Sequence, residues 1–213
     1  MKSVNVFPVS CLNFSDRYGR LIYREYQWGC TAAYQALAET EAYSLDTDRQ
    51  ARLVRPLYFG LLNEVQTDYA KKRLILALEH YGWRVGTGFL STPFILYVLA
   101  DIDIEYAYRL LENEEMPGWL FMTKTGATTI WESWEGTTAQ DGIASLNHYS
   151  KGAVCEWLFT TMCGVRVKGE NHFTIAPRPG GHLTHAGLSY DRAKRNCLLF
   201  EYDSAGLRQL RAR

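Results

Sequence analysis

Apolar residues recur at helical spacing through most of the first 165 residues. In the segment 70–81 they stand at i, i+4, i+7, i+8 and i+11, which places them on one face of a helix that Gly82 ends. The run FILYVLA after Pro93 is apolar all round, as a helix buried on several sides would be. Further stripes of helical spacing start at Ala32, Ile104 and Ala153. Successive helices joined by glycine-bearing loops predict antiparallel helical pairs rather than a βαβ array.

The periodicity changes from Val165 onward. The segments HFTIAPRP, THAGLSYD and NCLLFEYD are short, partly alternating and rich in aromatic and β-branched residues, and Pro, Gly and Asp separate them. They predict a small antiparallel β module packed on the helical part. The predicted fold class is therefore mainly α with a small β module, with one domain over residues 1–165 and the β module over 166–213.

Composition and charge exclude several classes of protein. The 213 residues carry 23 basic and 23 acidic side chains, and this zero formal charge gives no electrostatic footprint for nucleic acid or an anionic membrane surface. The most apolar stretch, 89–100, is too short to cross a bilayer, and the first residues lack the apolar core of a signal peptide. The odd number of cysteines, 5, argues against a disulfide framework and fits a reducing compartment, so we expect a cytoplasmic protein.

Aromatic residues are abundant, with 14 Tyr, 9 Phe and 6 Trp. Such rings stack on the C–H faces of sugars in carbohydrate-binding proteins, but a large hydrophobic core uses them as well. Composition alone favours the core.

A first candidate loop follows Gly118 and Trp119 and reads TKTGATTIWESWEG. It places the carboxylate of Glu132 between Trp131 and Trp134. Aromatic neighbours lower the local dielectric constant and offer stacking surfaces, a setting in which the pKa of a carboxylate is tuned for acid–base chemistry. A surface glutamate beside two core tryptophans explains the same pattern equally well.

A second candidate loop, SLNHYSKGAVCEWLF, occupies residues 145–159. Ser145 and Asn147 are suited to capping the helix that follows, which would place His148 at the N-terminus of that helix. There the imidazole can donate a hydrogen bond to a ligand hydroxyl, and the positive end of the helix disfavours its protonated form. The simpler alternative is a histidine that satisfies a loop carbonyl, and for a lone histidine we favour it.

Together, GATTIWESW and SLNHYSKGAVCEWL closely resemble the paired signature of bacterial α-L-rhamnosidases, and TGFLSTPFILYVLADIDIEYAYRLLENEEMPGW resembles the run upstream of it. The resemblance extends over roughly residues 26–177. It implies a six-hairpin glycosidase fold, an (α/α)6 barrel followed by a small β-sandwich-like module. It also implies hydrolysis of terminal α-L-rhamnosides with inversion of configuration, so that the partner of the chain would be a carbohydrate.

The same resemblance assigns roles to residues. The general base of the family falls on Glu132, and its sugar-contacting histidine falls on His148. The resemblance also implies that the pocket and the mouth of the barrel are shaped by Trp119, Trp131, Trp134, Thr87, Gly88 and Phe89.

The sequence departs from the family in one respect that matters for catalysis. The family's general acid lies in a motif similar to DCPQRERxGWxGD, and nothing like it occurs in these residues. Asp101, Glu135 and Asp141 are the carboxylates that could replace the acid, although we favour ordinary surface charges for all three. Ser133 stands where the family usually carries an arginine, which puts in doubt an ion pair to the base.

The chain therefore resembles a partial barrel with its β module. An incomplete barrel would expose apolar helix faces, so we expect self-association or an upstream polypeptide that completes it. Two functions stay open: a rhamnoside hydrolase, and a catalytically dead remnant or carbohydrate-binding fragment.

Other kinds of site have weaker support. His182 and His185 with Cys163 or Cys197 match no standard zinc spacing. The GTGF sequence at Gly86 lacks the lysine and the preceding strand of a phosphate-binding loop. We expect neither a metal ion nor a cofactor.

Overall fold

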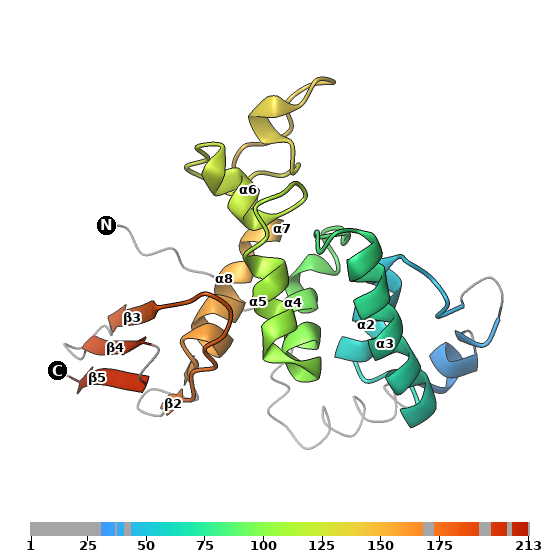
Figure 1. Cartoon of the computed structure of the whole chain (residues 1–213), viewed down its shortest axis with the longest axis horizontal. Coiled ribbons are helices and arrows are strands. Elements are labelled where there is room, and N and C mark those ends of the chain that lie inside the picture. The colour runs from blue at the N-terminus through green and yellow to red at the C-terminus, as the bar shows by residue number, and fades with distance from the viewer. Residues whose placement is uncertain are drawn as a thin grey trace, which may run out of the picture. The chain divides into compact units, whose positions relative to one another are not determined.

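A computed structural model of the chain describes residues 31–36, 38–40, 44–167, 173–191, 197–203 and 206–212. The chain divides into two compact units, Met1–Val98 and Leu99–Arg213. The described residues are mainly helical, with a few short strands near the C-terminus (Figure 1). Within these residues no helix is both long and apolar enough to span a membrane.

Two helices, α2 (Gln50–Tyr58) and α3 (Glu64–His80), form the centre of the first unit. α3 begins with a capping box, in which the Asn63 side chain accepts from the backbone of Gln66 and the Gln66 side chain accepts from the backbone of Asn63. The predicted apolar face of α3 is confirmed at four residues that are 0% exposed: Ala70, Leu74, Ala77 and Leu78. The prediction is wrong for Tyr81, which is the C-cap of the helix and is 44% exposed. Gly82 follows the helix with a φ of +65°, close to the predicted end.

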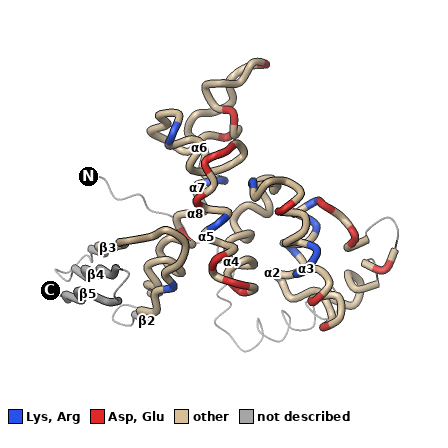
Figure 2. Tube along the Cα trace, viewed as in Figure 1, with Lys and Arg blue, Asp and Glu red and all other residues tan. Residues whose placement is uncertain are grey.

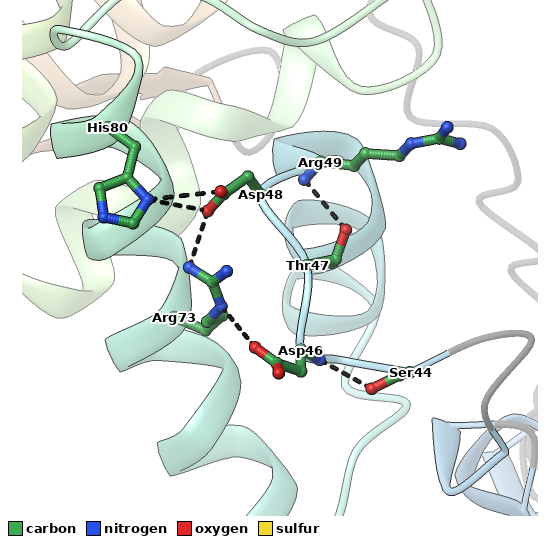
Figure 3. Close-up of polar contacts among 7 residues, drawn as sticks. All are labelled: Ser44, Asp46, Thr47, Asp48, Arg49, Arg73 and His80. Atoms are coloured by element: carbon green, nitrogen blue, oxygen red, sulfur yellow. Dashed lines mark hydrogen bonds and ion pairs between the residues drawn. The ribbon is translucent and has the colours of Figure 1, made fainter.

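The loop before α2 is fixed to α3 by charged side chains (Figure 3). α3 carries both acidic and basic residues (Figure 2). The Arg73 guanidinium binds Asp46 at 3.0 Å and Asp48 at 2.7 Å, and His80 Nδ1 lies 3.3 Å from Asp48. The hydrogen bond from His80, together with the Arg73 cation, lowers the pKa of Asp48. The network holds the start of α2 against α3.

Helices of the second unit follow α4 (Thr92–Ile102), which contains the boundary between the units. α5 (Ile104–Leu111) begins at Asp103, whose side chain accepts from the Glu105 N–H. Ala107 and Tyr108 on the predicted stripe of α5 are fully buried. The later helices are short, and the last is a π-helix: α6 (Trp119–Lys124), η2 (Gly136–Thr138), α7 (Tyr149–Gly152), α8 (Val154–Trp157) and η3 (Leu158–Met162).

In the part of the chain that the structure describes, five strands follow the helices. β1 (Val165–Val167) pairs antiparallel with β2 (Phe173–Ile175), and β3 (His185–Asp191), β4 (Cys197–Asp203) and β5 (Gly206–Ala212) form an antiparallel sheet in that order. The predicted strand segments are confirmed at β2, β3 and β4, whereas β1 and β5 were not predicted. A small core joins η3 to the strands through buried Cys163, Val165, Ala186 and Leu188.

The segment between β2 and β3 lies on α5. Tyr108 Oη donates to the Arg178 carbonyl at 2.7 Å, and Gly181 N–H donates to a Glu105 carboxylate oxygen at 3.0 Å. His182 binds Glu112 twice, through its N–H at 2.9 Å and through Nδ1 at 2.8 Å. The hydrogen bond between the His182 ring and Glu112, with the negative charge of Glu112, raises the pKa of His182. His182 therefore serves to hold this segment on α5.

The compact units divide between residues 98 and 99, a different place from the predicted domain boundary after residue 165. That domain boundary stays a prediction. The closed geometry of a barrel and the sandwich form of the β module likewise stay predictions.

Candidate functional site

Backbone hydrogen bonds bring the two candidate loops side by side. The Glu132 N–H donates to the Ser145 carbonyl at 2.8 Å, and the His148 N–H donates to the Ile130 carbonyl at 2.8 Å. The Thr129 hydroxyl also donates to the Leu146 carbonyl. Segments 129–132 and 145–148 therefore run alongside one another in the second unit. Glu132 and His148, which are 16 residues apart in the chain, both lie partly buried on this paired segment.

The Glu132 carboxylate is oriented by the same pairing. Its Oε2 atom accepts a hydrogen bond from the Ser145 N–H at 3.1 Å, while the Ser145 carbonyl accepts from the Glu132 N–H. Ser145 therefore holds both the backbone and the side chain of Glu132. A carboxylate fixed in this manner can accept a proton from a bound water or hydroxyl.

The predicted tryptophans differ in burial. Trp131 is 3% exposed and Trp119 is 5% exposed, whereas Trp134 is partly exposed. The Trp119 and Trp134 rings meet edge to face, with centroids 5.7 Å apart and an interplanar angle of 83°. The Trp131 ring covers Gly136, which has a φ of +49°. Among these three residues, Trp134 is the one that is partly exposed to solvent.

Gly136 is required by the close approach of the Trp131 ring. A Cβ atom on Gly136 would lie 1.7 Å from Trp131 Cε3, far inside van der Waals contact. The turn is also held by Ser133, whose hydroxyl accepts from the Gly136 N–H at 3.2 Å. Ser133 therefore stabilises the turn after Glu132.

His148 itself is the N-cap of α7, so the prediction that Ser145 and Asn147 would cap this helix is wrong. His148 Nδ1 accepts from the Ser150 N–H at 3.3 Å and lies 2.9 Å from the Ser150 hydroxyl. The Ser145 hydroxyl instead donates to the Asn147 carbonyl within the loop. Acceptance at Nδ1 fits a neutral imidazole that carries its proton on Nε2, the form that can donate to a sugar hydroxyl.

Lys151 joins the elements of the site, and the sequence patterns did not single it out. It is 4% exposed, its Nζ atom donates to the Glu132 carbonyl, and it lies 4.4 Å from the centroid of the Trp134 ring. Its own carbonyl accepts from Trp119 Nε1 at 3.0 Å. Burial lowers the pKa of Lys151, and the negative charges of Glu135 and Glu132 partly oppose this change. The sequence does carry one signal for this role: Lys151 stands on a short polar turn directly before an apolar helical stripe.

Thr87, Gly88 and Phe89 belong to the first unit. Thr87 is 5% exposed, and its hydroxyl lies 2.9 Å from the Thr92 hydroxyl, whereas Phe89 is 46% exposed. Because they lie in the other unit from Glu132, their place at the mouth of the site stays a prediction.

Gln50 holds the segment before this loop, a role that the sequence patterns also missed. Its amide donates to the Arg84 carbonyl at 2.9 Å and accepts from the Gly86 N–H at 2.8 Å. The Gln50 side chain is 1% exposed, and both hydrogen bonds are partly buried.

The other candidate carboxylates lie at the surface, and the charge of Glu135 acts on Lys151. Asp101, Glu135 and Asp141 all have exposed side chains. Among the described residues, no group of three or more His, Cys, Asp or Glu side chains is arranged to hold a metal ion. The side chain of Cys197 lies outside the described part of the chain, as do Cys11 and Cys30.

Comparison with known protein families gives a match that includes both candidate loops. The model of the bacterial alpha-L-rhamnosidase 6 hairpin glycosidase domain matches residues 20–162, about two thirds of the chain. The chain belongs to this family. The resemblance seen in the sequence is thereby confirmed, and its mainly helical structure agrees with the six-hairpin glycosidase domains of the relatives.

Relatives in this family are several times longer than the chain. It is 34% identical to an alpha-L-rhamnosidase of Streptomyces avermitilis over 151 residues, which is 67% of this chain and 15% of that protein. It is 33% identical to an alpha-L-rhamnosidase of Formosa agariphila over 178 residues, which is 74% of this chain and 19% of that protein. The chain thus spans less than a fifth of the length of these two rhamnosidases.

A solved rhamnosidase structure gives the corresponding match in three dimensions. The Streptomyces avermitilis alpha-L-rhamnosidase complexed with L-rhamnose superposes with a TM-score of 0.71 at 30% identity, and covers 89% of this chain and 19% of its own. The chain therefore corresponds to one part of a rhamnosidase.

Proposed function

We propose that the chain is part of a glycoside hydrolase that cleaves terminal α-L-rhamnosides with inversion of configuration, with Glu132 as general base and His148 binding the sugar. Membership of the family supports the substrate class. The observation that carries the assignment of residues is the backbone pairing of segments 129–132 and 145–148, because it places the carboxylate and the imidazole on adjacent segments.

The mechanism follows from the chemistry of inversion. Glu132 takes a proton from a water as that water attacks the anomeric carbon, and a second, protonated carboxyl group delivers a proton to the leaving oxygen. The two carboxyl groups of an inverting glycosidase stand roughly 6.5–9.5 Å apart. His148, as a neutral imidazole with its proton on Nε2, donates to a hydroxyl of the sugar. Trp134 offers a ring face to its C–H groups, with Trp119 and Trp131 packed behind the loop.

The general acid is proposed to come from outside these residues. The sequence has no counterpart of the family's acid motif, and the exposed carboxylates of Asp101, Glu135 and Asp141 are proposed to be surface charges. Residues 1–165 would then be part of an (α/α)6 barrel with Thr87, Gly88 and Phe89 at its mouth, and 166–213 a β-sandwich-like module. Self-association or an upstream polypeptide would cover the helix faces that a partial barrel exposes.

A second candidate function is a catalytically dead remnant or carbohydrate-binding fragment. The missing acid motif is the specific observation that favours it. Such a chain would bind L-rhamnose through His148 and Trp134 without hydrolysing a rhamnoside.

One experiment distinguishes the two functions. Hydrolysis of p-nitrophenyl α-L-rhamnoside is measured for the purified chain, for Glu132→Gln, and for Glu115→Gln, which changes an exposed glutamate of the same unit. The aryl leaving group needs little help from an acid, so the base alone gives a measurable rate. Glu132→Gln should lower kcat about 10²–10⁴-fold, the usual contribution of a general base, while Glu115→Gln keeps the rate.

The outcomes are separable. An unchanged rate in Glu132→Gln would refute the assignment of the base. No hydrolysis by the unmodified chain, together with calorimetric binding of L-rhamnose that His148→Ala abolishes, would establish the binding fragment instead.

A further inference from the structure

A lysine ammonium is buried beside the proposed base, although charged groups are costly to remove from water. Lys151 is 4% exposed, whereas Lys124 in the same unit pairs with Glu114 on the surface, with its side chain 65% exposed. A buried ammonium is retained only where hydrogen bonds and favourable charges replace its hydration. The burial of Lys151 therefore indicates that specific contacts replace the hydration of its ammonium.

The contacts of Lys151 converge on the Glu132 loop. Its Nζ atom donates to the Glu132 carbonyl and lies 4.4 Å from the centroid of the Trp134 ring. Its carbonyl accepts from Trp119 Nε1 at 3.0 Å. One residue thus holds the backbone after the proposed base and both rings of the edge-to-face tryptophan pair.

These contacts complete the fixation of Glu132. The peptide group before its Cα is held by Ser145, which accepts from the Glu132 N–H at 2.8 Å. The peptide group after its Cα is held by Lys151, through the Glu132 carbonyl. Since both peptide groups that flank the Cα are fixed, the direction in which the side chain leaves the backbone is fixed as well.

We propose that Lys151 is a positioning residue of the rhamnosidase site: its ammonium fixes the carbonyl of Glu132 against the face of Trp134, and so aims the Glu132 carboxylate. This inference rests on the proposed function for its effect on catalysis, but the fixation of the loop is testable without catalysis. The negative charges of Glu135 and Glu132 act on the ammonium, and both favour its charged form. The cation–π contact with Trp134 favours that form too.

The test compares Lys151→Met with Lys124→Met, a matched loss of one lysine from the surface of the same unit. The near-ultraviolet circular dichroism of the tryptophans reports the fixation of Trp119 and Trp134. Hydrolysis of p-nitrophenyl α-L-rhamnoside reports the aim of Glu132. Lys151→Met should lose tryptophan signal and about 10–100-fold in kcat, with KM little changed, because small misplacements of a catalytic group cost that much. Lys124→Met should match the unmodified chain in both.

A measurement on the unmodified chain covers the case in which Lys151→Met does not fold. Lysines are acetylated briefly in the native protein and counted by mass spectrometry. Lys151 should react at least roughly 10-fold more slowly than Lys124, because it is buried and hydrogen-bonded.

The results separate this inference from the proposed function. If the unmodified chain has no hydrolytic activity, loss of the tryptophan signal in Lys151→Met still supports the fixation of the loop. Equal acetylation of Lys151 and Lys124, or a Lys151→Met variant with unaltered tryptophan signal and kcat, would overturn the inference.

Discussion

Substitution of Gly136 by alanine tests how the site loop is built. Gly136 is buried under the Trp131 ring and has a φ of +49°. The new Cβ atom would lie 1.7 Å from Trp131 Cε3, and the nearest three ring atoms are all within 2.2 Å. The 3% exposed indole must therefore move out of its site. Since Trp131 directly precedes Glu132, the displacement reaches the proposed base.

Two terms give the magnitude. A left-handed backbone costs an alanine about 1–2 kcal/mol. Forcing an extra methyl group into a packed site costs about 1–3 kcal/mol more. The free energy of unfolding should therefore fall by about 2–5 kcal/mol in Gly136→Ala.

Gly126→Ala is the matched control, because Gly126 has a φ of +83° and a Cβ there meets nothing within 4 Å. Gly126→Ala includes the cost of a left-handed backbone for alanine and the change in entropy of the unfolded chain, but it includes no steric clash. Urea unfolding followed by tryptophan fluorescence gives both free energies. Gly136→Ala should be the less stable by about 1–3 kcal/mol, the clash term alone. Equal losses in the two variants would show that the Trp131 ring does not press on Gly136, and the account of the loop would be wrong.

Two further substitutions test other contacts. Gln50→Leu removes partly buried hydrogen bonds to the Arg84 carbonyl and the Gly86 N–H, and should lower the free energy of urea unfolding by about 1–3 kcal/mol; an unchanged value would contradict the role of Gln50. Glu112→Gln should lower the thermal midpoint more at about pH 6 than at about pH 9. The reason is that Glu112 raises the pKa of His182 in the folded state. The interaction of His182 with Glu112 therefore stabilises the fold fully at pH values below the pKa of His182 in the unfolded chain. This stabilisation is lost as the pH rises through the pKa of His182 in the folded state. A midpoint difference that does not depend on pH would exclude this linkage.

Much of the helical part could be predicted because burial follows the apolar period. The face of α3 at Ala70 and Leu74 lies where the spacing placed it, and the change of period at Val165 coincides with the start of β1. The family could also be predicted, since two loop sequences carry its signature. β5 was not predicted because its sequence, GLRQLRA, is more polar than the strand segments that were predicted, which are rich in aromatic and β-branched residues.

The contacts that build the site were less accessible to sequence reasoning. Lys151 and Gln50 have polar side chains that usually lie on the surface, and their burial depends on partners 19 and 34–36 positions away. The cap of α7 was assigned wrongly because serine, asparagine and histidine can all accept from a helix N–H. Which of them does so depends on the pairing of the loop with Ile130, and that pairing is a contact between distant segments.

The outer part of the 133–144 connection, beyond Trp134 and Gly136, can be changed without removing the contacts that build the site. Main-chain hydrogen bonds join the two ends of this connection irrespective of side-chain identity, and the outermost part, around Asp141 and Gly142, is exposed. Lengthening such a connection costs little entropy, about 0.6 kcal/mol for each doubling. New residues can accordingly be inserted around Asp141 and Gly142 while the Glu132 carboxylate and the His148 imidazole keep their separation. This part of the loop is therefore the natural place to vary the contacts that the protein makes with groups other than the sugar.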